Sequence, residues 1–505
     1  MTLIRRSMIP FILCAFCVAA QAEAQPAGFA GFVEGGVGYV NDPSANRLGN
    51  WGGIYDTGAA AFSYSTDFID FGAAFHFTND GKYSPTEFWM SKIGNQYFML
   101  DEGYTRLHAA GLAFEAGYLQ ALSTIETPYE VFLNPLGHSA LGMVLSFEDQ
   151  FFQYESRWIG VNIRSPFTYG YGDPMTKAAE TWQDKGVNYR LIAVKLSGFR
   201  IGYEESSVYL RSFDANYFFS PLPSILTNTL LTQGSNPWSQ GANGQNDNSL
   251  MGLFSDYKSG PFYAEAQFLV DDINLNFLFP SLYSPNLDKF AWSIGGRYKF
   301  PFGTLGFWHG GATAHTYAAS YSSPTDANTI PYEYVYYPTV EFPAGSGIPM
   351  DPRDSNIGFP WGENALAFKI TFDTDLLGGS PWAFGLSTSI EYVINGSKSP
   401  DNPWHQYTDP SQIPDRIQLF NVGGPEVLNN ILIFHGAVTK RIGNLEVRVG
   451  IDVGGDFNAL GVAAVSGTPP EPPMLAGVPG TNYLILDLIL GVRYTFGAGP
   501  QAEPK

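Results

Sequence analysis

The sequence predicts an all-β protein, a transmembrane antiparallel up-and-down β-barrel of about 18 strands, with a range of roughly 16 to 20. Three observations carry this prediction. Apolar and polar residues alternate with a period of two along many segments, from about residue 30 to the end of the chain. The connections between these segments are alternately short and long. Aromatic residues make up 15% of the chain and charged residues only 15%, where about 25% charged is usual.

The clearest alternation lies in Tyr483–Phe496, which we expect to be the closing strand of the barrel. One parity holds Asp487 and Arg493, and the other parity is continuously apolar and ends in the aromatic residues Tyr494 and Phe496. A soluble sandwich would bury the apolar face against a second sheet, whereas a transmembrane barrel would turn it to lipid. The strand resembles the closing strand of bacterial outer-membrane proteins, although a tail follows Phe496. This resemblance implies recognition of Tyr483–Phe496 by the barrel-assembly machinery.

The N-terminus has the pattern of a secretory signal peptide. Arg5 and Arg6 precede an apolar run, Met8 to Ala20, and small residues then offer a cleavage site. We expect residues 1–24 to be removed, residues 25–496 to form one barrel domain, and residues 497–505 to be a short periplasmic tail. Both cysteines of the chain lie in the first segment, so the mature protein is expected to lack thiol and disulfide chemistry.

The expected strands follow one another along the chain with few irregularities. The pair Leu141–Glu155 and Arg157–Arg164 has the weakest alternation. The other expected strands are Ala30–Val40, Ile54–Ser65, Ile69–Asn79, Gln96–Leu107, Leu112–Gln120, Val187–Leu196, Phe199–Ser206, Ser249–Lys258, Phe262–Asp271, Lys289–Phe300, Thr304–Ala318, Asn364–Asp373, Trp382–Asn395, Leu428–Ile442, Leu445–Gly454 and Tyr483–Phe496.

Short turns join these strands at one end of the predicted barrel and long connections at the other. Short periplasmic turns and long outer loops are typical of bacterial outer-membrane barrels. The expected long connections are Asn41–Gly53, Asp80–Asn95, Ala121–Ala140, Ser165–Gly186, Ser207–Asn248, Asp272–Asp288, Ala319–Glu363, Gly396–Val427 and Gly455–Asn482.

The spacing of aromatic residues fits the height of a membrane. Trp382 and Tyr392 share the apolar parity of one strand and lie about 33 Å apart along it. A strand tilt of about 40° reduces this separation to about 25 Å of height, the distance between the aromatic girdles of such barrels. An outer-membrane location in a diderm bacterium, with lipid as partner, follows from this fit.

Composition and motifs argue against several functions. A net charge of −20 makes nucleic acid an implausible partner. The seven histidines are dispersed, and no pair has the spacing of metal ligands. No nucleophile elbow or phosphate-binding loop is present. We therefore expect no enzymatic activity, no catalytic residue, no metal and no cofactor.

Charged residues recur on the polar parities, which a barrel would turn to its lumen. Glu446, Arg448 and Asp452 share one strand, and Asp487 and Arg493 lie on the next. Such rows can set the electrostatic field of a pore, or they can neutralise one another across strands and stiffen the wall. We expect Arg493 to face the lumen near Glu446 or Asp452, and Tyr494 and Phe496 to face lipid at the periplasmic edge.

The middle of the chain contains its most individual stretch. Phe218-Phe219-Ser220-Pro221-Leu222 lies in a long connection, and Tyr263–Asp272 follows as a strand that ends in Asp271 and Asp272. Over about Phe218–Asn276 the chain resembles the capsule-assembly outer-membrane family (Wzi-type). That resemblance implies an 18-stranded barrel that holds surface polysaccharide and is not an enzyme. The pattern lacks the family's helical portion before the barrel.

Two functions remain open at this point. The first is a capsule-assembly-like barrel that binds or anchors surface polysaccharide through Asp271, Asp272, Tyr334, Tyr336 and Trp361, since aromatic faces beside carboxylates suit sugars. The second is a passive porin for small hydrophilic solutes, because 18 strands leave a wide lumen unless loops plug it. We expect Ser207–Asn248 and Ala319–Glu363 to fold inward.

Overall fold

The computed structural model describes residues 28–41, 53–80, 97–135, 139–161, 184–209, 211–227, 247–272, 287–318, 320–321, 334–336, 349–376, 383–398, 404–405, 417–421, 425–463 and 474–497. The expected signal peptide, residues 498–505 of the expected tail, and Trp382 lie outside these residues.

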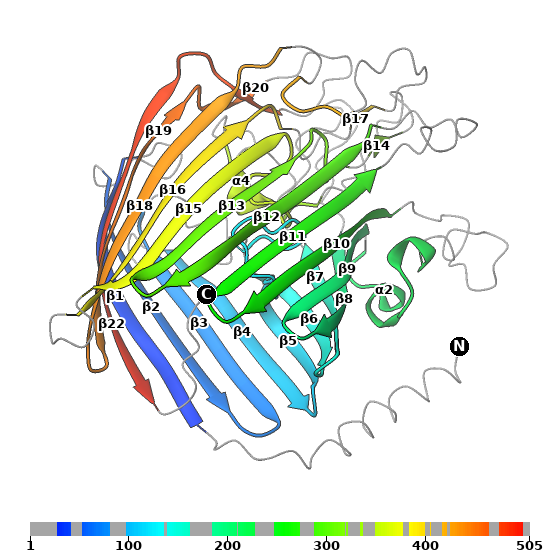
Figure 1. The fold of residues 1–505 in the computed structure, drawn as a ribbon, viewed down its shortest axis with the longest axis horizontal. Coiled ribbons are helices and arrows are strands. Elements are labelled where there is room, and N and C mark those ends of the chain that lie inside the picture. Colours follow the sequence, from blue (N-terminus) through cyan, green and yellow to red (C-terminus); the bar gives the residue numbers. More distant parts are fainter. Residues whose placement is uncertain are drawn as a thin grey trace.

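The structure is a closed antiparallel barrel of 18 long strands, which confirms the predicted fold class (Figure 1). Each long strand pairs with the next long strand along the chain, and β22 pairs with β1 to close the barrel. The strands are β1 (Gly28–Val40), β2 (Ile54–Ser65), β3 (Ile69–Thr78), β4 (Tyr97–Ala109), β5 (Leu112–Gln120), β6 (Ser139–Glu148), β7 (Phe152–Val161), β8 (Lys185–Leu196), β9 (Phe199–Tyr209), β10 (Asn248–Ser259), β11 (Phe262–Asp272), β12 (Lys289–Phe300), β13 (Gly303–Ala312), β15 (Ala365–Leu376), β16 (Phe384–Asn395), β18 (Asn429–Ile442), β19 (Leu445–Phe457) and β22 (Asn482–Gly497).

Smaller elements lie in the long connections. Two short pairs are separate from the barrel sheet: β14 (Ser320–Tyr321) with β17 (Trp404–His405), and β20 (Leu460–Ala463) with β21 (Met474–Gly477). The described helices are α2 (Ala215–Phe219) and α4 (Pro352–Ser355). None of the helices among the described residues is both long and apolar enough to cross a membrane.

Three strand predictions are wrong in their boundaries, and the others lie within a few residues of the structure. The turn expected after Glu155 lies earlier, between β6 and β7. The Asp149 carboxylate accepts hydrogen bonds from the backbone N–H groups of Phe151 and Phe152, both at 2.7 Å, and this local motif makes the turn. The strand expected to run to Ala318 ends at Ala312, because the chain then turns into the barrel.

The outside of the barrel is apolar. On β22, Leu484, Leu488 and Leu490 are 64%, 40% and 47% exposed, whereas Asp487 and Arg493 point to the interior. The same outward parity of neighbouring strands carries exposed residues such as Val449 and Val37. An apolar belt around a closed antiparallel barrel must face hydrocarbon, because exposing so large an apolar surface to water is unfavourable. The protein is an outer-membrane β-barrel.

The closing strand has the predicted faces, and Arg493 lies beside Glu446 as predicted, although its ion pair is with a residue of another strand. Tyr494 is 49% exposed on the outward face, and Phe496 stacks on Phe29 of β1. Arg493 lies opposite Glu446 in the β19–β22 ladder. Its guanidinium nevertheless pairs with Glu34 of β1, at 2.6 Å, while Glu446 pairs with Arg441. Arg493 has neighbours on both sides, and the pattern of one strand pair could not rank them.

Candidate functional site: a lumen narrowed by an inward-folded segment

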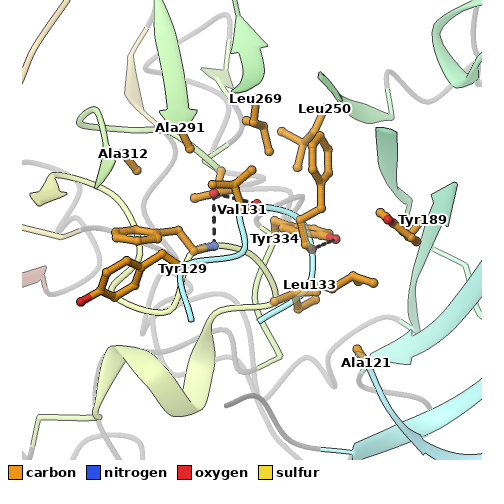
Figure 2. Packing of buried hydrophobic residues seen from close by; sticks show 14 of the residues in the cluster. Ala121, Tyr129, Val131, Leu133, Tyr189, Leu250, Leu269, Ala291, Ala312 and Tyr334 are labelled. Atoms are coloured by element: carbon orange, nitrogen blue, oxygen red, sulfur yellow. Dashed lines mark hydrogen bonds between the residues drawn. The ribbon is translucent and has the colours of Figure 1, made fainter. Parts of the chain in front are cut away.

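The connection between β5 and β6 folds into the barrel and forms the centre of its packed interior. We call residues 121–135 the inward segment. Tyr129, Val131, Phe132 and Leu133 are each at most 1% exposed, and they pack against wall residues such as Leu250 of β10 (Figure 2). Burying four large side chains at this point explains why the segment stays inside the lumen.

The inward segment has no regular secondary structure, so its backbone groups need other partners. Pro128 and Pro135 carry no N–H group. The Val131 N–H donates to Gln267 Oε1 on β11 at 3.2 Å. The Glu130 carboxylate accepts from the N–H groups of Phe132, at 2.7 Å, and Leu133. Irregular backbone at membrane depth is tolerated where it is buried in protein and satisfied in this way.

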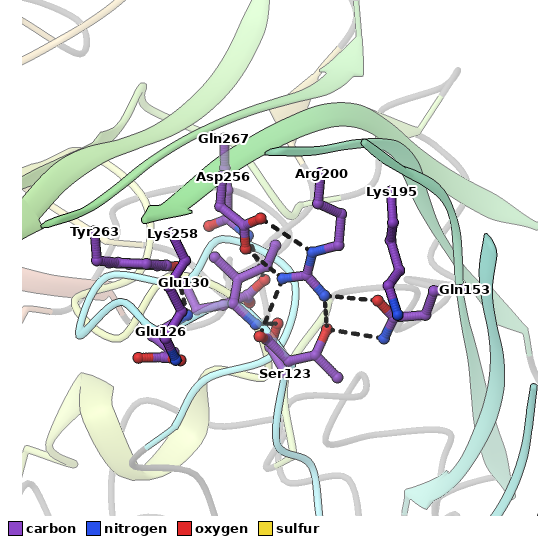
Figure 3. A network of polar contacts seen from close by, with 12 residues as sticks. Ser123, Glu126, Glu130, Gln153, Lys195, Arg200, Asp256, Lys258, Tyr263 and Gln267 are labelled. Carbon is purple, nitrogen blue, oxygen red and sulfur yellow. Dashed lines mark hydrogen bonds and ion pairs between the residues drawn. The ribbon is translucent and has the colours of Figure 1, made fainter. Parts of the chain in front are cut away.

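Ion pairs and hydrogen bonds fix the inward segment to the wall formed by β7 and β9–β12 (Figure 3). The Arg200 guanidinium donates to Asp256 and Gln153 on the wall and to Thr124 Oγ1 on the segment, the last at 2.9 Å. Glu126 pairs with Lys258, at 2.8 Å, and with Arg297. Because several wall strands hold the segment at once, it is positioned as a rigid part of the lumen.

The centre of the inward segment buries a carboxyl group. Glu130 is 1% exposed and accepts a hydrogen bond from Gln267 Nε2 at 2.7 Å. Burial raises the pKa of Glu130 above its usual range, and the nearby Glu265 carboxyl raises it further, against the hydrogen bonds that favour the charged form. Docking of the inward segment is therefore coupled to protonation of the Glu130 carboxyl group.

A second layer of loop residues covers the inward segment. The Tyr334 hydroxyl donates to the Phe132 carbonyl at 2.6 Å, and the Tyr317 hydroxyl to the Val131 carbonyl at 2.8 Å. Asn134 Nδ2 donates to the carbonyl of Arg353 at 2.8 Å. Residues 334–336 and 353–361 of Ala319–Glu363 thus lie inside the barrel, as expected.

The residues that the sequence proposed for sugar binding are mostly buried. Tyr334, Tyr336 and Trp361 are 0%, 6% and 3% exposed within the packed loops. Asp271 lies at the end of β11, where Lys289 Nζ pairs with it at 2.9 Å and with Asp272 at 2.8 Å. The side chain of Asp271 is 0% exposed and that of Asp272 30% exposed. As folded, only Asp272 of these five presents an accessible polar group.

Three of the five predicted lumen charges line a cavity on the opposite side of the lumen. The cavity has a volume of about 240 Å³ and is lined by β16, β18, β19 and β22, with the side chains of Ser389, His435, Arg448, Asp452 and Asp487 among its walls. Asp452 and Asp487 lie opposite each other in the β19–β22 ladder, and His435 Nδ1 is 2.8 Å from Asp452. Glu446 and Arg493 lie on the same interior-facing parities, nearer the short turns.

Glu391 of β16 joins the cavity to the inward segment. Its Oε1 accepts from the Tyr129 hydroxyl at 2.9 Å and from Trp361 Nε1 at 3.2 Å. Its Oε2 is 3.2 Å from Lys369 Nζ and 3.8 Å from His435 Nε2. The inward segment and the charged wall therefore meet at the Glu391 carboxylate. This contact marks one boundary of the cavity.

The sequence analysis missed the inward segment and misplaced another connection. Ala121–Ala140 was expected only as a long connection, but the run Tyr129-Glu130-Val131-Phe132-Leu133 within it is too apolar for an exposed loop. That run was the available signal. Ser207–Asn248 was expected to fold inward, and this is wrong for its described residues 211–227, which lie on the outside of the wall (Figure 1). No three or more acidic, histidine or cysteine side chains are gathered as a metal site in the described part of the chain.

Comparison with known proteins adds only a general likeness of fold. No family model matches the chain, and no curated protein matches it. Among solved structures, Wzi of Escherichia coli, a carbohydrate-binding β-barrel of the outer membrane involved in group 1 capsule assembly, is 10% identical, with a TM-score of 0.48, over 96% of this chain and 87% of that one. Acinetobacter baumannii OccAB2 is 12% identical, with a TM-score of 0.46, over 94% and 98%. Pseudomonas aeruginosa OccK5 is 9% identical, with a TM-score of 0.43, over 94% and 98%. At these values the comparisons do not distinguish one function from another.

Proposed function

We propose that this protein is a diffusion channel for small hydrophilic solutes, with a passage that runs between the inward segment and the charged wall of β16, β18, β19 and β22. The observation that carries the proposal is the division of the lumen. The segment is fixed to one side by Arg200, Lys258 and Arg297, and a polar cavity lies on the other side. A passage lined by Ser389, Asp452 and similar groups can replace part of the hydration of a solute.

The chemistry of the wall suggests the preference of the channel. Asp452 and Asp487 bring two carboxylates to the cavity, and the whole chain carries a net charge of −20. His435 and Arg448 contribute positive or hydrogen-bonding groups on the same wall. Side chains of opposite charge along one constriction orient dipolar solutes, and the excess of acidic side chains favours cations over anions of equal size.

Covalent block of the passage tests this proposal. Ser389→Cys places a thiol at the cavity, and Ser255→Cys places one on the outward parity of β10. In planar bilayers, a charged methanethiosulfonate reagent should reduce the current through Ser389→Cys and leave Ser255→Cys unchanged. A protein that carries no current, or a Ser389→Cys current that modification leaves unaltered, would contradict the proposed passage.

The resemblance over Phe218–Asn276 motivates a second candidate, an anchor for surface polysaccharide. Of the residues assigned to that function, Asp272 keeps an accessible carboxylate, and the others would require rearrangement of the loops. Deletion of the gene should then release polysaccharide from the cell surface without lowering its synthesis. Unchanged cell-bound polysaccharide in the deletion strain would exclude this candidate and leave the channel proposal intact.

A further inference from the structure

A stretch of the connection after β9 lies on the outer wall of the barrel. We call residues 211–227, which include α2, the outer-wall segment, and Figure 1 shows α2 beside β7–β9 on the outside of the barrel. Ser156 Oγ on β7 donates to the Phe218 carbonyl at 2.8 Å. The Arg190 guanidinium on β8 donates to the carbonyls of Tyr217 and Leu222. The Ser224 N–H donates to Glu205 Oε2 on β9 at 2.7 Å.

The wall beneath the outer-wall segment carries a pair of charged side chains on its outward face. Arg190 and Glu205 form an ion pair at 2.6 Å, and both side chains are 1% exposed. On the same outward parity, Ile201 of β9 and Leu253 of β10 are 48% and 63% exposed. An arginine facing hydrocarbon near the midplane of a barrel costs about 2–4 kcal/mol. The outer-wall segment lowers this cost, because its carbonyl groups and Glu205 accept hydrogen bonds from the two terminal nitrogens of the guanidinium.

The outer-wall segment presents apolar side chains in place of the polar wall that it covers. Phe219, Leu222, Ile225 and Leu226 are 39%, 43%, 46% and 50% exposed. The hydroxyl of the buried Tyr217 turns away from this surface and donates to Asp247 at 3.0 Å. The exposed fractions of the four residues match those of the belt residues, so the apolar exterior continues across the segment.

The height of the covered ion pair places it within the membrane band. Glu205 lies six residues beyond Phe199, the first residue of β9 at the short-turn end. Six residues span about 20 Å of strand, or about 15 Å of height at a tilt of about 40°. The apolar band of such barrels is about 25 Å tall, so the ion pair lies in the half of the band nearer the long connections.

We propose that the outer-wall segment is embedded in the outer leaflet, where Phe219, Leu222, Ile225 and Leu226 contact lipid acyl chains. Two facts favour acyl chains as the occupant. The apolar surface is continuous with the lipid-facing belt, and the wall behind it is unsuited to hydrocarbon. Residues 211–227 are therefore a lipid-contacting part of the transmembrane surface and are not part of an extracellular loop. This inference does not depend on the proposed channel function.

Fluorescence quenching in proteoliposomes tests the inference. The full chain, with Cys14→Ala and Cys17→Ala, receives a single cysteine that carries a bimane label at Leu222→Cys or Ile225→Cys. Leu253→Cys provides the lipid-facing control, and Asn444→Cys in the short turn between β18 and β19 provides the aqueous control. Nitroxide-labelled acyl chains and iodide serve as lipid and water quenchers, and heat-modifiable migration on gels confirms folding of each variant.

Labels at Leu222 and Ile225 should be quenched by the nitroxide lipid within about twofold of Leu253, and by iodide several-fold less than Asn444. Iodide quenching equal to that of Asn444 at both positions would place the segment in water and overturn the inference. Protection from both quenchers would show that a protein covers the segment, and this result would also overturn it. Using two positions guards against a local effect of either label.

Discussion

Placing an arginine on each face of the closing strand β22 should have unequal consequences for the stability of the barrel. Leu488 is 40% exposed on the outward face, and it lies six residues, or about 15 Å of height, from Tyr494 at the short-turn edge. This position is near the middle of an apolar band about 25 Å tall. Leu488→Arg should therefore destabilise the folded barrel by about 2–4 kcal/mol, which is roughly a 30- to 900-fold change in the folding equilibrium.

The neighbouring position provides the matched control. Ile489 lines the polar cavity together with Asp452 and Asp487, so an arginine at Ile489 can remain hydrated or pair with either carboxylate. Folding yields measured by heat-modifiable migration, and midpoints in urea with lipid vesicles, should fall for Leu488→Arg and change little for Ile489→Arg. Equal losses for the two variants would refute the assignment of faces, because a register shift by one residue exchanges them.

Two further changes test the interior. Burial raises the pKa of Glu130 to about 7, so its contribution to docking of the inward segment should be full below about pH 4.5 and should be lost as the pH rises through about 7. Glu130→Gln should remove this contribution and flatten the pH dependence of proteolysis of the segment between these values, and an unchanged profile would contradict this origin. Lys289→Met should cost about 3–5 kcal/mol of stability in urea titrations, because it leaves the Asp271 carboxylate buried without its cation. Adding Asp271→Asn should restore much of this loss. A double variant no more stable than Lys289→Met would contradict the pairing.

The wall of the barrel was predictable because its physics is local to each strand. A period of two separates lipid from lumen on every strand, and one face of Tyr483–Phe496 displays that period without interruption. The same alternation placed Asp452 and Asp487 on the interior parity, where the structure also places them. The error between Leu141 and Arg164 arose where Asp149 makes a turn through its own side chain, a signal that periodicity does not carry.

The inward segment and the outer-wall segment were not predictable in the same way. The inward segment is held by residues far away in sequence, such as Arg200 and Arg297, and no pattern within residues 121–135 identifies those partners. Arg190 and Glu205 interrupt the apolar parity of β8 and β9, and this break was the sequence signal for a cover on the outside. Inward and outward folding both bury a connection, so the choice between them depends on the whole tertiary structure.

The single-channel conductance of the barrel with and without its inward segment tests the channel account most directly. Residues 124–133 can be replaced by a glycine–serine linker of equal length, with heat-modifiable migration on gels as the check that the barrel has folded. The native protein should show small, stable current steps in planar bilayers, and the folded variant should show steps several-fold larger. A closed native barrel, or equal conductance in the two proteins, would contradict a passage bounded by the inward segment.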